Sequence, residues 1–327
     1  MKTYSFIGSD KNAGKTTAFT FVYQSLQRRH SNRQEVCLTS IGINGEPADS
    51  YDNAPKPKIT IREKTHFITA GEQLKGMTGT YAVRQVFTGP AFSKPYVWAV
   101  ALQDIECVLE GPNDKAAIKQ AKQTIGQIAA DTLLLIDGSI DRQFLGDPSI
   151  SDGICFSLLL SDRPEQQSKA DDLLFALSLA PCSPDHRAII DAHRQEGTRS
   201  ILCSKEGKLL YRGFSTPFLD ESLKSTCTNN LERACLLYLN GALTPSFYRF
   251  LAAFQGWTVI LDNLTCYHSI SVQKGLNPRF RPVLQTRHTV PIAYLFIRED
   301  NGQNRIDLPV SAPVINLFRD VPHEIEL

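Results

Sequence analysis

The stretch that decides the fold lies close to the amino end and reads Gly8-Ser9-Asp10-Lys11-Asn12-Ala13-Gly14-Lys15-Thr16-Thr17. An apolar run at residues 4–7 precedes it and is typical of a buried strand, whereas residues 16–28 carry apolar side chains at helical spacing. A glycine-rich loop between a strand and a helix offers inward-pointing N–H groups and the positive end of the helix dipole to an anion. We therefore predict that all the quoted residues bind the polyphosphate of a nucleotide.

Individual positions in this loop have separate predicted roles. Lys15 is expected to reach the β- and γ-phosphates and to stabilise charge during phosphoryl transfer, so it is the first candidate catalytic residue. The Thr16 hydroxyl is expected to ligate Mg²⁺, and Asp10 could orient the attacking water or rigidify the loop. Ser9 stands where the standard pattern has its first glycine, so we expect Ser9 to keep a negative φ and Gly8 to take the strained dihedral. An ordinary strand-to-helix turn with a capping threonine is the alternative.

Acidic residues provide the second chemical signal. Residues 131–138 form an apolar run that closes with Asp137 and a glycine. An acid at the carboxyl end of a buried parallel strand lies where open α/β sheets bind ligands, so we predict that Asp137 holds Mg²⁺ opposite Thr16. Glu110 and Asp49 compete for this role, and Asp137 could instead cap a turn. Asp49 is also the second candidate catalytic residue, because it could orient the attacking water.

The charge balance limits the classes of partner. Lys+Arg 35 against Asp+Glu 34 leaves a formal charge of +1 over 327 residues, so no overall field draws the chain to nucleic acid or to an anionic membrane. A local basic cluster at residues 277–282, followed by Arg287 and His288, could grip phosphate, a base or an acidic partner, or could be a solvated loop.

The cysteine pattern and the hydropathy bear on the compartment. Eight cysteines are scattered without C-x-x-C spacing, which favours buried reduced thiols over disulfides or a zinc site. No apolar run approaches the roughly 18 residues that cross a bilayer. We expect a cytoplasmic protein with no membrane or nucleic-acid partner.

Strands and helices alternate along the chain. This order predicts an α/β fold with a doubly wound, mainly parallel sheet and helices on both faces. Several short strands around residues 55–100 indicate a β-rich insertion within a nucleotide-binding core at residues 1–185. Residues 186–327 are expected to continue the α/β fold or to form a partner- or substrate-binding half.

The quoted loop resembles that of the dethiobiotin synthetase family, whose pattern is G-[TS]-D-x-x-x-G-K-T. In that family a threonine or serine follows the first glycine, so the resemblance implies that Ser9 belongs to a variant phosphate loop in a P-loop NTPase fold. The pair Asp137-Gly138 is similar to the family's strand-end E-G, and Glu110-Gly111 matches it less well. The activity implied is that of an ATP-dependent ligase or small-molecule kinase.

A second resemblance covers more of the chain. It is carried, in this order, by residues 9–17, 39–46, 134–142 and 240–244. These blocks resemble the KamB family, a subunit of the lysine 5,6-aminomutase reactivase. The resemblance implies an ATP-hydrolysing, Mg²⁺-dependent helper that works with a second, MutS-like subunit to expel damaged cobalamin from a cobalamin-dependent aminomutase. A nucleotide-gated binding module with little turnover is a third alternative.

Overall fold

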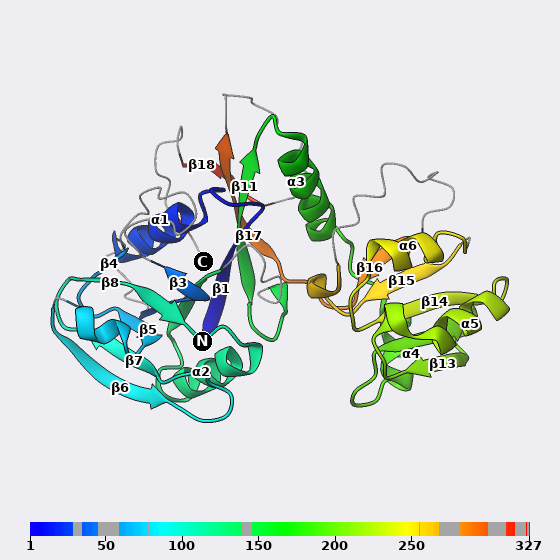
Figure 1. The fold of residues 1–327 in the computed structure, drawn as a ribbon, viewed down its shortest axis with the longest axis horizontal. Coiled ribbons are helices and arrows are strands. Elements are labelled where there is room, and N and C mark those ends of the chain that lie inside the picture. Colours follow the sequence, from blue (N-terminus) through cyan, green and yellow to red (C-terminus); the bar gives the residue numbers. More distant parts are fainter. Residues whose placement is uncertain are drawn as a thin grey trace.

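Two main sheets organise the molecule. The computed structural model describes residues 1–28, 35–44, 59–77, 79–138, 146–254, 256–267, 282–299, 312–317, 325 and 327, without the side chain of Cys235. Within this part of the chain a nine-stranded sheet and a five-stranded sheet form two lobes, which Figure 1 shows as separate bodies.

The large sheet has a parallel body and an antiparallel edge. Across the sheet its strands are β18 (Val314–Asn316), β17 (Ile292–Glu299), β11 (Gly153–Leu160), β1 (Lys2–Gly8), β10 (Leu133–Asp137), β2 (Val36–Ser40), β5 (His66–Ala70), β7 (Tyr96–Ala101) and β6 (Tyr81–Phe87). Neighbouring strands from β18 to β5 are parallel, whereas β7 pairs antiparallel with β5 and with β6. The mixed α/β class and the parallel-rich sheet are therefore as predicted.

Helices cover both faces of this sheet. They are α1 (Lys15–Arg28), α2 (Lys115–Ile128) and α3 (Pro164–Leu177). Phe19 of α1 packs in one core with Phe6 of β1, while Ile118 of α2 packs in the other core with Ile7. Adjacent residues on a strand point to opposite faces, so Phe6 and Ile7 enter different cores. Burial on both faces explains why the central strands read as continuous apolar runs.

The β-rich segment extends the edge of the large sheet and adds two ribbons. Strand β4 (Ile59–Ile61) pairs with β8 (Ile105–Cys107), and β3 (Gly42–Asn44) pairs with β9 (Leu109–Gly111). The apolar stretch at residues 97–109 does not form one strand, because the chain leaves β7 after Ala101 and changes partner.

A carboxylate explains this change of partner. Asp104 accepts a hydrogen bond from the Glu63 amide at 3.0 Å and forms an ion pair with Arg62. These contacts hold residues 102–104 against the segment that follows β4, so the chain pairs with β4 instead of continuing along β5.

The second lobe is built on a smaller sheet. Its strands are β13 (Leu209–Gly213), β12 (Ser200–Ser204), β14 (Ala234–Leu239), β15 (Thr258–Leu261) and β16 (Val283–Thr286), and its helices are α4 (Pro184–His193), α5 (Glu221–Asn229) and α6 (Pro245–Leu251). Strands β14, β15 and β16 are parallel, whereas β12 is antiparallel to both of its neighbours.

The chain returns to the first lobe near its end. Strands β17 and β18 join the large sheet beside β11, although they come from the half predicted to begin at residue 186. The second sheet spans only residues 200–286, so the two lobes do not correspond to two consecutive halves of the sequence.

Burial agrees with the expected state of the thiols. Cysteines 37, 107, 155, 182, 203, 227 and 266 are free and buried. Burial raises the pKa of both Cys107 and Cys227 to about 12, which keeps these thiols protonated and poorly reactive. Among the described helices, none has both the length and the apolar character required to cross a bilayer.

Candidate functional site

The quoted loop lies where connections of the large sheet diverge. Strand β1 ends at Gly8 and α1 begins at Lys15. From α1 the chain continues to β2, beyond β10, whereas the connection after β10 leads to β11 on the other side of β1. In open α/β sheets such a switch point opens a crevice at the carboxyl ends of the strands.

Ser9 anchors the start of this loop to the neighbouring strand. Its amide donates to the Ser157 carbonyl at 2.9 Å, and its hydroxyl accepts from the Leu159 amide at 2.9 Å. The side chain is buried and completes the hydrogen bonding between β1 and β11. A glycine at this position could not accept the hydrogen bond from the Leu159 amide.

The strained backbone lies further along the loop than expected. Asn12 has φ 60° and Gly14 has φ 83°, whereas Gly8 is not in the left-handed region. The prediction that Gly8 takes the strained dihedral is thus wrong. Left-handed residues between right-handed ones turn successive N–H groups toward one side, which is the geometry of an anion-binding nest.

Two residues that were predicted to bind Mg²⁺ contact each other at the end of this loop. The Thr16 hydroxyl donates to a carboxylate oxygen of Asp137 at 3.0 Å, although the residues are 121 positions apart. Asp137 is the last residue of β10 and is 3% exposed. Its backbone is fixed because Ile41 donates to its carbonyl at 2.8 Å and because it pairs in register with Phe6.

Positively charged side chains from distant elements also contact the loop. Lys169 of α3 pairs with Asp10 at 3.3 Å, and Arg298 near the end of β17 donates to the Asn12 carbonyl at 2.7 Å. Asp10 also accepts from the Lys11 amide at 2.9 Å, which agrees with a loop-stiffening role for Asp10. Sequence reasoning missed Lys169 and Arg298, because no local motif marks them.

Asp49 and Glu110 are the two acids predicted as alternatives to Asp137. Asp49 lies outside the described residues, as do residues 277–281 of the basic cluster. Glu110 lies on β9, where it forms an ion pair with Lys94 and accepts from Gln73 at 2.7 Å. Hydrogen bonding to Glu110 raises the pKa of Lys94, so the Lys94 ammonium group stays charged. Glu110 is thus engaged by the β-rich segment, whereas Asp137 contacts the loop.

The Thr16–Asp137 pair fits a hard cation. Mg²⁺ prefers oxygen ligands and usually binds through one or two protein groups together with phosphate oxygens and water. The Thr16 hydroxyl and the Asp137 carboxylate supply such oxygens side by side. In the described part of the chain no three or more His, Cys, Asp and Glu side chains gather into a cluster able to hold a metal by themselves. A metal bound here would therefore need further ligands, such as phosphate oxygens or water.

The comparisons with known proteins leave the family open. No family model matches the chain, and neither the search of curated proteins nor the search of solved structures gave a match.

Proposed function

We propose that the loop at residues 8–17 binds the polyphosphate of ATP with Mg²⁺ and that the protein is a P-loop NTPase. The observation that supports this proposal best is the 3.0 Å hydrogen bond from Thr16 to Asp137. It joins the loop hydroxyl to an acid at the end of a parallel strand, which are the two protein groups that hold Mg²⁺ in enzymes of this kind.

The residues of the chain divide the proposed chemistry among them. The loop amides and Lys15 would neutralise the phosphate oxygens and stabilise the charge that develops on the transferred group. Thr16 and Asp137 would hold Mg²⁺, which would offset the negative charge of the phosphates. Arg298 and Lys169 act on the loop itself, because their contacts go to Asn12 and Asp10.

Calorimetric titration with ATP in the presence of Mg²⁺ tests this assignment. We expect Lys15→Ala to weaken binding at least tenfold, because a lysine–phosphate contact is lost. Lys2→Ala is the matched control, since Lys2 is exposed at the opposite end of β1, and should bind like the wild type. Equal affinity of wild type and Lys15→Ala, or no binding by the wild type, would refute the proposal.

The metal role needs its own measurement. Removing Mg²⁺ should weaken ATP binding to the wild type but should change little for Asp137→Asn, since the amide no longer offers a charged ligand. An Asp137→Asn protein with the full Mg²⁺ dependence would move the role to Glu110 or Asp49.

The KamB resemblance extends the proposal to a reactivase subunit that uses ATP to expel damaged cobalamin from an aminomutase. Expelling a tightly bound cofactor requires two conformations of different affinity, and the γ-phosphate can bias such an equilibrium. This function requires phosphate release stimulated by a MutS-like subunit and the aminomutase. Stimulation by a small carboxylate or alcohol instead would favour the ligase or kinase alternative.

A further inference from the structure

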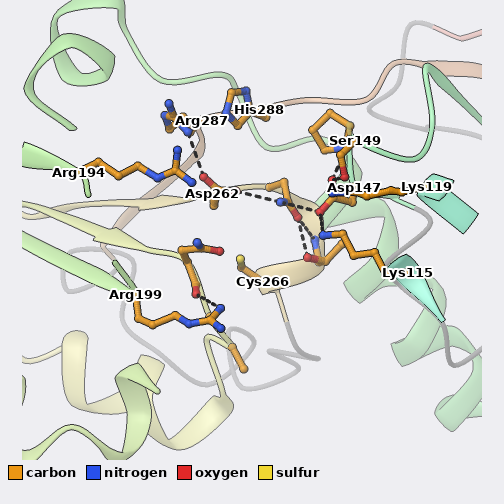
Figure 2. A pocket seen from close by; sticks show the side chains of 16 residues that line it. Lys115, Lys119, Asp147, Ser149, Arg194, Arg199, Asp262, Cys266, Arg287 and His288 are labelled. Carbon is orange, nitrogen blue, oxygen red and sulfur yellow. Dashed lines mark hydrogen bonds and ion pairs between the residues drawn. The ribbon is translucent and has the colours of Figure 1, made fainter. Parts of the chain in front are cut away.

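A cavity of about 660 Å³ lies between the lobes and shares no residue with the loop at residues 8–17. Lys115 and Lys119 of α2 line one side, and the carboxyl edge of the second sheet lines the other. Figure 2 shows Lys115 and Arg194 entering from opposite sides. The volume is within the range of pockets that hold small organic ligands, roughly 300–1,000 Å³.

The topology of the second sheet directs four strand ends toward this cavity. Asn240, Asp262 and Arg287 directly follow the parallel strands β14, β15 and β16. Arg199 directly precedes β12, which runs antiparallel to β14 and so begins at the same edge. All four residues line the cavity. The carboxyl edge of a parallel sheet is where such folds bind ligands.

The floor of the cavity is a buried polar network. Asn263 donates to Asp262 at 3.1 Å and to Asp147 at 3.5 Å, so its amide links the second lobe to the first. Asp262 also accepts from Tyr238 at 2.6 Å and from Arg287 at 3.3 Å. These buried groups are held in place before any ligand arrives.

Positive charge exceeds negative charge in the lining. Five basic side chains, Lys115, Lys119, Arg194, Arg199 and Arg287, stand against the two carboxylates of Asp147 and Asp262. Both carboxylates are already engaged by basic groups, Asp147 by Lys115 and Asp262 by Arg287.

Three of the basic side chains can still form an ion pair with a ligand. Within the described residues no ion pair joins Lys119, Arg194 or Arg199 to an acid. The Arg199 guanidinium donates a 3.3 Å hydrogen bond to the Asn240 carbonyl. An uncompensated group of cations around a concave, polar site attracts anions.

The protonation state of His288 agrees with a positive electrostatic potential in the cavity. Burial and then the charge of Arg287 lower the pKa of His288, so the ring is neutral at pH 7. Its Nε2 lies 2.8 Å from Arg287 Nη1 and can accept a hydrogen bond from it in the neutral form. This histidine therefore adds no further charge.

We propose that this inter-lobe cavity binds a small organic anion with at least two negative charges, carried by phosphate or carboxylate groups. Arg194 and Arg199 bind it from the second lobe and Lys119 from the first. A ligand that contacts both sides links the lobes. The proposal does not depend on nucleotide binding at the loop.

Calorimetric titration with pyrophosphate and with citrate tests this site, on a Lys15→Ala background without Mg²⁺ so that the loop contributes little. We expect saturable binding of at least one probe. Arg194→Gln and Arg199→Gln should each weaken it five- to tenfold, and both residues are exposed, so the fold should persist. Lys205→Gln is the matched control, because Lys205 is exposed at the other end of β12.

Each outcome has a defined meaning. Binding of pyrophosphate alone would identify a phosphorylated ligand, and binding of citrate alone would identify a polycarboxylate. Weakening by both arginine substitutions with unchanged binding by Lys205→Gln would support the site. No saturable binding of either probe, or equal affinities for all variants, would overturn the proposal.

Discussion

At the scale of single residues, the loop is shaped by groups that a motif does not specify. The hydroxyl of Ser9 accepts the Leu159 amide, and Asn12 takes a left-handed conformation that asparagine tolerates better than most residues. Gly14, at φ 83°, is the one loop glycine whose backbone requires the absence of a side chain. The motif by itself therefore does not specify which residues of the loop adopt the left-handed backbone conformation.

A buried histidine gives a prediction at this scale. Burial lowers the pKa of His66 first of all, and Arg84 lowers it further against the effect of Glu35. Its Nδ1 accepts a hydrogen bond from the Trp98 indole at 3.0 Å, which requires the neutral ring. The unfolded chain therefore binds a proton before the folded one does, so stability should fall as the pH drops below the unfolded pKa of about 6.5.

Denaturant unfolding at pH 7.5 and pH 5.5 checks this prediction. The loss of stability from His66 cannot exceed about 1.4 kcal/mol per pH unit. In His66→Asn the amide oxygen can still accept from Trp98, but the group no longer titrates, so the difference between the two pH values should shrink. An unchanged difference would show that His66 is not the responsible group.

At the scale of elements, helix α2 belongs both to the inter-lobe cavity and to the core of the large sheet. It carries Lys115 and Lys119 into the inter-lobe cavity while Ile118 packs on the large sheet. Its N-cap is Asp114, whose carboxylate accepts from the amides of Ala116 at 2.7 Å and Ala117 at 3.4 Å. The position of the two lysines thus depends on how this helix begins.

Removing this cap should destabilise the protein. Asp114→Ala leaves helix amides without an acceptor and should lower the free energy of unfolding by roughly 0.5–2 kcal/mol. Asn113→Ala is the control, since Asn113 is exposed and directly precedes the N-cap residue Asp114. Equal losses for the two variants in urea unfolding would contradict the assignment.

At the scale of the whole molecule, the last strands of the chain return to the sheet of the first lobe. Strands β17 and β18 leave the second lobe and complete the large sheet beside β11, so the second sheet is inserted between parts of the first lobe. The same return brings Arg298 to the loop. Movement of the second lobe relative to the first would therefore pull on a strand that contacts the proposed nucleotide site.

The returning strand should be essential for the stability of the first lobe. Phe296 is 2% exposed, and its ring lies 6.3 Å from that of Phe21 on α1. Phe296→Ala should lower the free energy of unfolding by roughly 3–5 kcal/mol, because a large buried side chain is replaced by a cavity. Val283→Ala, at a 56% exposed position in the second sheet, should cost far less. A small effect of Phe296→Ala would mean that the carboxyl-terminal strand is dispensable.

Much of the local structure could be predicted from the sequence. The helical spacing after the loop predicted α1, and the apolar run ending in Asp137 predicted β10. These signals are local, because periodicity acts within one or two turns of the chain. The chemical character of the loop is determined in the same way, by ten consecutive residues.

Only the tertiary structure decided which elements become neighbours. It placed Asp137 against Thr16, brought Lys169 and Arg298 to the loop, and gathered Arg199, Asp262 and Arg287 at one edge of the second sheet. It also returned β17 to the first lobe instead of extending the second. Periodicity fixes the faces of a strand but carries no information on the strand beside it, since that choice depends on how all the apolar faces are buried together.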